Sequence, residues 1–519
     1  MVSSLAGGAF GGKQGNVHLL LAPMAAKLTG RPVRLVLARD HVFSLMPFRG
    51  ASRQRLRLGA GADGRLQALI QDSVAAQGAK GAYVEALGET VEKAYACPNI
   101  RIHTQAARLD TNASGWMRGP GSCLGRFASE VAMDVLAHQV GMDPLEFRLL
   151  NYADVEPDTG HEWSSKSLRQ CYQIAGDRVG WFGRDPRVGA MREGRLLVGC
   201  GMATSLYPVL QMPAVARVIL GRDGRARAQT ATHEIGQGAV TAMTQIAAEA
   251  IGLPVGDVTL EFGDTALPYG GMTVGSMSTL TNGAAVHEAG ALVKGQVCTR
   301  ATRDPDSPLH GLPPHDLRVV DGRVVGPDGA GETVAALMAR HPDGEIAEEA
   351  VTGRDMGRSK YGRQTFGAQF AKVLIDPDTM HVQVERLVGA FAGGRAINPL
   401  LVRSQLMGAM VWGLGQALFE ETTIDERTGA WVNRSLGEAL VPTNADVDVI
   451  EALIVDEDDT RAHPLGVKGM GEVGVVGTAA AVGNAIFHAT GLRLTALPFR
   501  IDRLLAAAAA TPRAAPLLA

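Results

Sequence analysis

The sequence predicts a mixed fold of the α+β class rather than a doubly wound parallel sheet. Helical and strand periodicities follow each other irregularly along the chain, and several strand-like segments are joined by short Asp-Gly turns, as in β-hairpins. In addition, 64 glycines among 519 residues exceed the roughly 7% of ordinary proteins. The glycines gather in short segments, which indicates many tight loops between the regular elements.

Before residue 180, the apolar spacing predicts helices, one hairpin and one further strand. Asp143 and Pro144 are expected to begin a short helix, with Glu146 in capping-box register. Residues 151–190 are expected to form a polar and aromatic connection with a domain boundary near 180. The predicted elements are a helix over 16–30, a strand over 32–38, a hairpin over 53–79 and a helix over about 126–140 that ends at Gly141.

After residue 180, strands and helices alternate around a polar segment. Residues 302–360 are rich in Pro, Gly and charge, which predicts an irregular insertion, and the low-complexity tail 503–519 is expected to fray. The chain is therefore divided into a domain over 1–180 and a domain over 181–519. The predicted elements are strands over 196–204, 214–232 and 257–263, a strand pair over 367–391, and helices over 239–252 and 399–421.

Charge and composition argue against several classes of protein. Fifty basic and 53 acidic residues leave a net charge of −3, without the basic stripe that nucleic acid selects. No uninterrupted apolar run reaches the roughly 18 to 20 residues of a membrane span, and the first residues do not resemble a signal peptide. The five cysteines include no C-x-x-C pair, so an iron–sulfur or structural zinc site within this chain is not expected.

Two glycine motifs mimic nucleotide sites. Residues 7–13 fit G-x-x-x-x-G-K, but Gln14 replaces the Ser or Thr that would hold magnesium, and too few residues precede the motif for a strand. Residues 469–474 fit G-x-G-x-x-G, but the segment before them is no strand, and Glu472 would lie beside the pyrophosphate. Both nucleotide interpretations are therefore disfavoured.

Other segments suit a large polar ligand, although each has a structural alternative. EIGQG (234–238) presents backbone N–H groups at a helix start, where an anion can bind, and the alternative is a helix cap. Residues 270–284 carry several hydroxyls and could equally be a polar loop. Gln405 lies on a glycine-rich helix that could simply pack, and Arg118 lies in a constrained turn that could be surface. Glu472, a carboxylate among closely spaced glycines at 467–478, has a loop or helix-cap role as its alternative.

Taken together, these motifs resemble one family. GGAFGGK (7–13), MRGPG (117–121), EIGQG (234–238), SQLMGAMVWGLGQAL (404–418) and KGMGEVG (468–474) resemble, in this order, the molybdenum-binding large subunit of the xanthine dehydrogenase and aldehyde oxidoreductase family. Residues 117–152 look most like bacterial aldehyde oxidoreductases built from three subunits. The resemblance extends over roughly 5–505 and implies two molybdopterin-binding domains.

The resemblance implies roles for individual residues. Glu472 matches the family's catalytic base, and Arg118 matches the arginine of the active-site turn. In this family the pterin dithiolene holds the metal, so no protein side chain is expected to ligate it. The positions that match the loop beside the metal and the segments that hold the pterin and its nucleotide tail are Gly8, Phe10, Gly11, Gly12, Gly236, Gln237, Gly238, Gly275, Ser276, Gln405, Lys468, Gly469 and Gly471.

The resemblance also implies an activity: oxidation of aldehydes to carboxylic acids with oxygen from water, Glu472 taking a proton and hydride passing to a sulfido group. The implied cofactor is molybdenum with molybdopterin, in its cytosine dinucleotide form. An iron–sulfur small subunit and an FAD-binding subunit are implied as electron-accepting partners, in the cytoplasm or, if a partner carries the signal, in the periplasm. Hydroxylation of an N-heterocycle and a truncated, non-catalytic remnant remain alternatives.

This sequence departs from the family pattern in three places. Family subunits extend upstream of the 7–13 motif with a hammerhead-like domain, which is absent here, so the chain is expected to be a fragment or to receive that part from another polypeptide. Gln14 stands where purine-oxidising members carry Glu, which disfavours xanthine. NASGWMRG (112–119) replaces the CSFR-type loop of carbon monoxide dehydrogenases.

Overall fold

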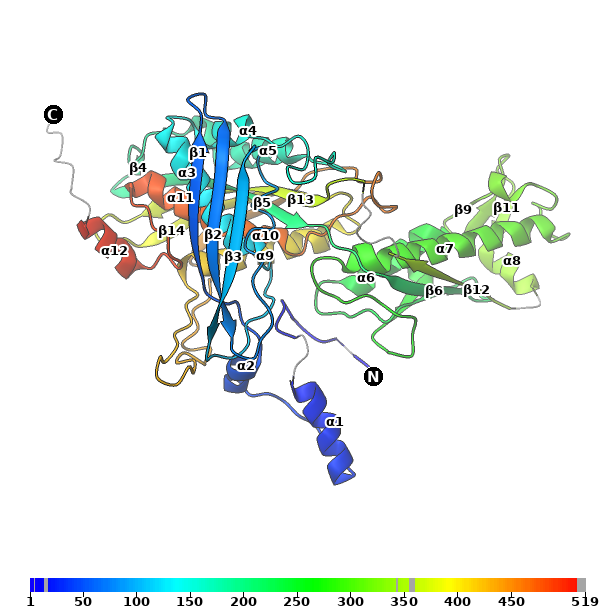
Figure 1. The fold of residues 1–519 in the computed structure, drawn as a ribbon. Helices are drawn as coiled ribbons and strands as arrows, with labels where there is room; N and C mark the ends of the chain where they lie inside the picture. Colours follow the sequence, from blue (N-terminus) through cyan, green and yellow to red (C-terminus); the bar gives the residue numbers. More distant parts are fainter. Residues whose placement is uncertain (4, 14–16, 342–343, 354–359, 511–519) are drawn as a thin grey trace.

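The central sheet of the main body has five strands in the order β15-β14-β13-β5-β4 (Figure 1). The computed structural model describes the chain apart from residues 4, 14–16, 342–343, 354–359 and 511–519. Strands β5, β13 and β14 are antiparallel neighbours, and β15 runs parallel to β14. The strands are β4 (Arg192–Glu193), β5 (Leu196–Pro208), β13 (Gln364–Ile375), β14 (Val382–Ala392) and β15 (Val447–Ile454).

Helices cover both faces of this sheet, which explains why its central strands are apolar on both sides. Met202 and Leu206 of β5 pack in one buried cluster with helix α5 (Leu168–Val179), whereas Ala203 and Tyr207 pack in another. The second cluster contains residues of α9 (Pro399–Leu418), α10 (Val473–Val476) and α11 (Thr478–Thr490). Gly201 lets α11 approach β5, because a Cβ there would lie 2.1 Å from the backbone nitrogen of Ala485.

A second sheet lies beside helix α3 (Ser122–Gln139). It contains β1 (Ser52–Ala60), β2 (Leu66–Gly78) and β3 (Ile100–Leu109). The predicted hairpin is confirmed as the antiparallel pair β1 and β2, while β3 joins β2 in parallel. The capped helix is also confirmed, since the Asp143 carboxylate accepts a 2.8 Å hydrogen bond from the Leu145 N–H at the start of α4 (Pro144–Leu150).

A smaller lobe projects from the main body, at the right of Figure 1. Its four-stranded sheet has the order β12-β6-β7-β8, and helices α6 and α7 share one buried core with it. A three-stranded sheet, β9 to β11, lies at its far end. The elements are β6 (Ala214–Leu220), β7 (Ala226–Gln229), β8 (Val258–Glu261), β9 (Arg318–Val320), β10 (Arg323–Val325), β11 (Gly331–Thr333), β12 (Ile346–Thr352), α6 (Ala239–Ile251), α7 (Ser278–Arg303) and α8 (Val334–Arg340).

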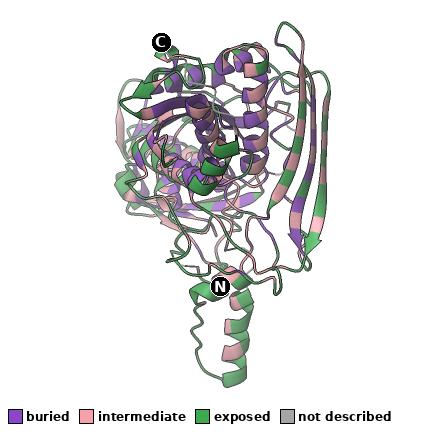
Figure 2. Cartoon of the chain, turned by 90° about the vertical axis from the view of Figure 1, so that its left-hand side faces the viewer, coloured by how far each residue is buried: buried purple, intermediate pink, exposed green. Residues whose placement is uncertain are grey.

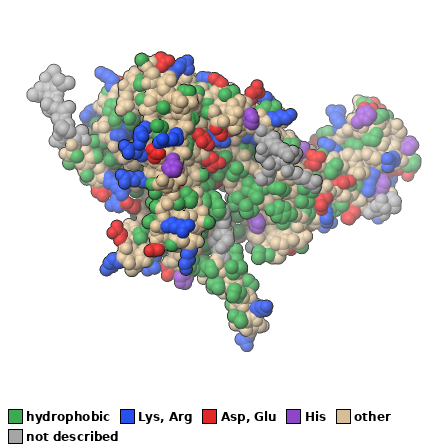
Figure 3. All heavy atoms as spheres, viewed as in Figure 1, with side chains coloured by type: hydrophobic (Ala, Val, Ile, Leu, Met, Phe, Trp, Pro, Cys, Tyr) green, Lys and Arg blue, Asp and Glu red, His purple; other side chains and the backbone are tan. Residues whose placement is uncertain are grey.

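In the N-terminal arm, residues 17–45, the first helix extends away from the body (Figures 1 and 2), while the Phe43 carbonyl accepts a 3.3 Å hydrogen bond from Asn112. Helix α1 (Val17–Thr29) is confirmed, but none of its residues is buried, and α2 (Arg39–Leu45) follows. Hydrophobic side chains are exposed along α1 in Figure 3. The predicted strand over 32–38 is wrong: this segment pairs with no strand in the described part of the chain, because no neighbouring backbone lies along it.

Four further expectations need correction. The connection 151–190 contains helix α5, and the hydroxyl-rich loop over 270–284 becomes α7 from Ser278 onward. The insertion 302–360 is not irregular, since β9 to β12 and α8 lie within it. Strands β3, β4 and β15 and helices α2, α10 and α11 were not predicted. The start of the tail forms α12 (Ile501–Ala510), and 511–519 lies outside the described residues. Short 3₁₀ turns occupy Trp181–Gly183, Val255–Asp257 and Pro314–Asp316.

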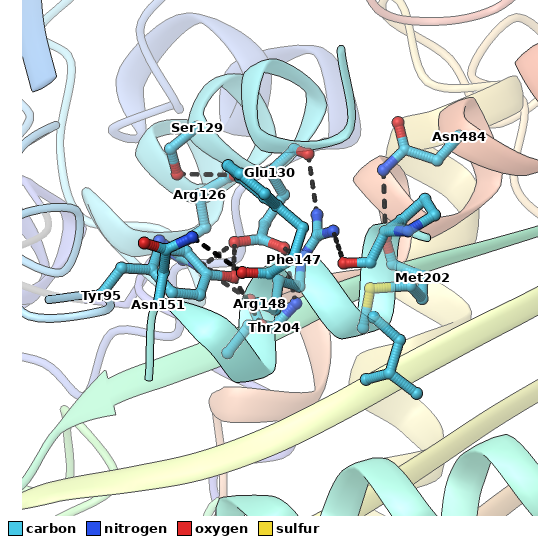
Figure 4. Close-up of polar contacts among 12 residues, drawn as sticks. Tyr95, Arg126, Ser129, Glu130, Phe147, Arg148, Asn151, Met202, Thr204 and Asn484 are labelled. Carbon is cyan, nitrogen blue, oxygen red and sulfur yellow. Dashed lines mark hydrogen bonds and ion pairs between the residues drawn. The ribbon is translucent and has the colours of Figure 1, made fainter. Parts of the chain in front are cut away.

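A fully buried charged network ties α3 and α4 to the central sheet (Figure 4). The Glu130 carboxylate accepts hydrogen bonds from Tyr95 Oη at 2.7 Å, Arg148 Nε at 2.8 Å and the Thr204 N–H at 2.8 Å, and it pairs with Arg126. Although burial opposes ionisation, Arg126 and Arg148 hold the pKa of Glu130 below its usual value. Glu130 is therefore the common acceptor of this network.

Residues Val473–Thr490 are apolar and long enough to pass a compositional test for a membrane-crossing helix. However, 83% of this segment is buried inside the fold. It consists of α10 and α11, which pack against β5, so its apolar composition is explained by its place in the core.

Candidate active site

Glu472 lies where the glycine-rich segment enters α10, at a partly buried position. One carboxylate oxygen, Oε1, accepts a 3.1 Å hydrogen bond from the Gly119 N–H. The other, Oε2, accepts a 2.8 Å hydrogen bond from Ser276 Oγ. Two segments far apart in the sequence therefore hold both oxygens of this carboxylate, while its side chain caps no N–H of α10.

Arg118 is 5% exposed and lies against the same segment. Its Nε donates to the Gly471 carbonyl at 2.8 Å, and Nη2 donates to the Gln405 carbonyl at 2.8 Å and to Gln405 Oε1 at 3.3 Å. Burial lowers the pKa of Arg118 to about 10, while Glu472 acts in the opposite direction. Arg118 is therefore a buried cation that joins the segment before Glu472 to α9, and not the surface arginine that was its alternative.

The loop over residues 7–12 reaches Arg118 from the other side. The Arg118 N–H donates to the Phe10 carbonyl at 2.9 Å, and the guanidinium carbon lies 5.6 Å from the centre of the Phe10 ring. Phe10 has a left-handed φ of 51° and packs edge-on against Trp412 of α9 at 5.2 Å. Gly11 is required here, because a Cβ would lie 2.1 Å from the Trp116 carbonyl oxygen. Gly8 and Gly12 belong to the same loop.

The loop over 275–278 packs against the Glu472 segment. Gly275 and Ser276 both have φ of 58°, a conformation that turns the Ser276 hydroxyl toward Glu472. At Gly469 a Cβ would lie 2.4 Å from the Ser276 carbonyl oxygen, so this contact needs glycine. Gly471 also approaches Ser276, since a Cβ there would lie 3.2 Å from its Oγ. These residues form one connected layer around the carboxylate.

The EIGQG loop contacts the loop before Gly7, but its own side chains accept hydrogen bonds from its N–H groups. Glu234 accepts hydrogen bonds from the N–H groups of Gly236 at 2.8 Å and Gly238 at 3.1 Å. Gln237 accepts from the Ile235 N–H at 2.8 Å. This loop therefore acts as a cap at the start of α6, which is the alternative to anion binding. It contacts its neighbours through the Glu234 carbonyl, which accepts from the Ala6 N–H at 3.0 Å.

Lys468 points away from the Glu472 carboxylate into the protein interior. Its Nζ pairs with Glu457 Oε2 at 3.0 Å and donates to the Ser165 carbonyl at 2.9 Å. Both side chains of the ion pair are buried. This pair anchors the segment that carries Glu472, and direct contact of Lys468 with a cofactor stays a prediction.

Two residues around the site were missed from the sequence. Glu234 lies just before Gly236 and Gly238, where it accepts hydrogen bonds from their N–H groups. A carboxylate at the start of a helix is a sequence signal that could have identified it. Tyr207 is 1% exposed, and burial together with the neighbouring Glu472 carboxylate raises its pKa well above its usual value. Nothing in the alternation of β5 marks Tyr207 as different from its buried apolar neighbours, so its position had no sequence signal.

The start of α7 has the features of a site for an anionic ligand. Met277, the residue before it, makes no capping hydrogen bond with its side chain. Ser278 Oγ is buried and has no hydrogen-bond partner among the described residues. A helix N-terminus favours phosphate-like groups, and this one lies next to Ser276 and Glu472. The residues present therefore fit a large cofactor with anionic groups at this place.

Comparison with known proteins identifies the class. Two family models described as molybdopterin cofactor-binding domains match residues 1–152 and 175–448. The aldehyde oxidoreductase molybdenum-binding subunit PaoC of Escherichia coli K12 is 33% identical over 97% of this chain and 67% of its own length. The putative xanthine dehydrogenase molybdenum-binding subunit XdhA of the same organism is 29% identical over 97% of this chain and 68% of its own.

The solved structures agree on the fold. Quinoline 2-oxidoreductase from Pseudomonas putida 86 superimposes with a TM-score of 0.87 and 24% identity, over 98% of this chain and 68% of its own. The chain belongs to the molybdenum-binding subunits of the xanthine dehydrogenase and aldehyde oxidoreductase family. It is a molybdopterin-binding oxidoreductase subunit, and it spans about two thirds of the length of these relatives.

Proposed function

We propose that this subunit oxidises aldehydes to carboxylic acids, with Glu472 as the general base. The observation that carries the proposal is the Glu472 carboxylate, held at both oxygens by Gly119 and Ser276 next to the buried Arg118. The 33% identity to an aldehyde oxidoreductase subunit supports the substrate class. A carboxylate has about four acceptor positions, so its contacts with Gly119, Ser276 and the neighbouring Tyr207 leave Glu472 able to accept a proton from the attacking oxygen.

Arg118 acts on the base through the backbone and through charge. Its hydrogen bonds to Gly471 fix the residue before Glu472, so the carboxylate is held in one orientation. Its buried positive charge stabilises negative charge nearby. This electrostatic stabilisation is stronger where water is excluded than in bulk water. Phe10, edge-on against Trp412 and close to Arg118, is half exposed and borders this side of the site.

The proposed cofactor is molybdenum with molybdopterin in the cytosine dinucleotide form. When bound, it supplies the activated oxygen and accepts two electrons. The residues that would hold it are Gly275, Ser276 and Ser278 at the start of α7, together with Gln405, Gly469 and Gly471, while Gly236, Gln237 and Gly238 would border it. No cluster of three or more His, Cys, Asp or Glu suited to a metal occurs in the described ranges, and the pterin is proposed to hold the metal.

The relatives are named as subunits, so partners are part of the proposal. We propose an iron–sulfur small subunit and an FAD-binding subunit as electron acceptors, and a cytoplasmic location. Gln14, on which the argument against xanthine depends, lies outside the described residues. N-heterocycle hydroxylation is therefore tested as a competing outcome, by offering an N-heterocycle beside an aldehyde.

The test is Glu472→Gln in the assembled enzyme. Glutamine keeps the shape but cannot take a proton at neutral pH, so aldehyde turnover should fall by roughly 10²- to 10⁴-fold while molybdenum and pterin contents stay unchanged. Glu426→Gln, at an exposed position, is the matched control and should keep full turnover. Turnover by Glu472→Gln within about threefold of the unchanged enzyme would reject the general base, since such catalysis contributes far more.

A further inference from the structure

Lys166 lies in a cavity on the main body that does not include Glu472. The cavity has a volume of about 400 Å³ and is lined by Tyr152, Asp154, Val155, Glu162, Trp163 and Lys166. Lys166 Nζ lies 4.1 Å from the centre of the Tyr152 ring and 4.9 Å from those of Trp163 and Phe366. Aromatic faces thus replace most of the water that an ordinary lysine head group would contact.

The polar contacts of Lys166 are few. Its Nζ donates to the Ala153 carbonyl at 2.5 Å and has no ion pair within the part of the chain that the structure describes. The carboxylates at the cavity have other partners: Asp154 pairs with Arg169 at 3.6 Å, and Glu162 pairs with Arg461 at 2.9 Å.

Lys468 provides a comparison on the same ring. Its Nζ lies 5.8 Å from the centre of the Phe366 ring and is paired with Glu457. Lys166 lacks such a carboxylate contact, and its charged form faces aromatic rings and the Ala153 carbonyl instead. Burial lowers the pKa of Lys166 to about 7; Asp154 opposes this change and Arg169 adds to it. At neutral pH about half of such amines are uncharged and nucleophilic.

We propose that Lys166 is a site of covalent attachment for small aldehydes, separate from the site at Glu472. The uncharged Nζ adds to the aldehyde carbon, a C–N bond forms, and loss of water gives an imine, with no oxidant or reductant consumed. The rings of Tyr152 and Trp163 and the carboxylates of Asp154 and Glu162 line the cavity, so a short aldehyde meets both apolar and polar surface there. The proposal does not depend on aldehyde oxidation by this subunit.

The test traps the imine. The full chain carrying Glu472→Gln, so that turnover does not consume the probe, is incubated briefly at pH 7 with propanal and cyanoborohydride, which reduces the imine to a stable N-propyl amine. Peptide mass spectrometry then compares Lys166 with Lys27, an exposed lysine of α1. An ordinary lysine is only about 0.04% uncharged at pH 7, so we expect Lys166 to be modified at least about tenfold faster.

Two controls complete the experiment. The rate at Lys166 should rise as the pH passes through about 7 and level off about two pH units higher, where its amine is almost fully uncharged. Lys166→Arg keeps the positive charge, and it should lose the modification of this peptide while Lys27 reacts as before. Modification of Lys166 no faster than Lys27 at pH 7, with the chain folded by circular dichroism, would overturn the proposal.

Discussion

The region around Glu472 and the N-terminal arm are built in opposite ways from similarly apolar sequence. Around the site, loops from five parts of the chain contact each other and lie next to buried helices of the core. In the arm, α1 has no buried residue, and Leu20 is 67% exposed and Leu28 85% exposed. An isolated helix of this length is marginal in water, so α1, unlike the helices around the site, gains no stability from buried side chains of its own.

The largest effect is expected in the buried network. Glu130→Ala leaves Arg126 and Arg148 buried without their carboxylate, and this should lower the free energy of unfolding by about 3–5 kcal/mol in urea denaturation. Because the folded-state pKa of Glu130 is lowered, its contribution is present above the ordinary carboxyl pKa and is lost as the pH falls through the folded value. The difference from the unchanged chain should therefore shrink below about pH 4. A loss under about 1 kcal/mol would contradict the network's role.

An intermediate effect is expected at Ser276. Ser276→Gly removes the hydroxyl that holds Glu472 but keeps the left-handed backbone, and should lower kcat for an aldehyde by about tenfold, the equivalent of one charge-assisted hydrogen bond. Ser276→Ala should lose the same activity and be less stable than Ser276→Gly, because a φ of 58° is strained for alanine and unstrained for glycine. Full activity in the glycine variant would show that the hydroxyl does not position the base.

The smallest effect is expected in the arm. Leu20→Asp should change the free energy of unfolding of the isolated chain by less than about 0.5 kcal/mol, because the side chain is already exposed. Leu414→Asp on α9, where the side chain is fully buried, is the matched control and should prevent stable folding. Destabilisation by Leu20→Asp comparable to that control would mean that α1 packs against the body in solution.

Local sequence signals predicted the elements that local interactions determine. The hairpin of β1 and β2 follows from its Asp63-Gly64 turn, and α4 follows from Asp143 and Pro144. Helix α5 was missed although its buried residues recur at the spacing of an amphipathic helix. The β-branched run at 32–38 predicted a strand, but a strand also requires a neighbouring backbone, which a local pattern does not reveal.

The candidate site was predictable only through the family resemblance. Glu472, Arg118, Phe10, Ser276 and Gln405 are brought into one connected contact set. No periodicity relates residues so far apart in the sequence. Several of these motifs, taken alone, also fitted a purely structural role such as a helix cap or a polar loop. Their chemical roles and the domain boundary at 180 stay predictions.

The most direct test of the central claim is an experimental structure of the assembled enzyme purified with its molybdenum and pterin. The account predicts that the pterin contacts the 275–278 and 469–471 segments and that the metal lies beside the Glu472 carboxylate, within reach of one proton transfer. A pterin bound at another part of the chain, with Glu472 still closed between Gly119 and Ser276 and remote from the metal, would contradict it.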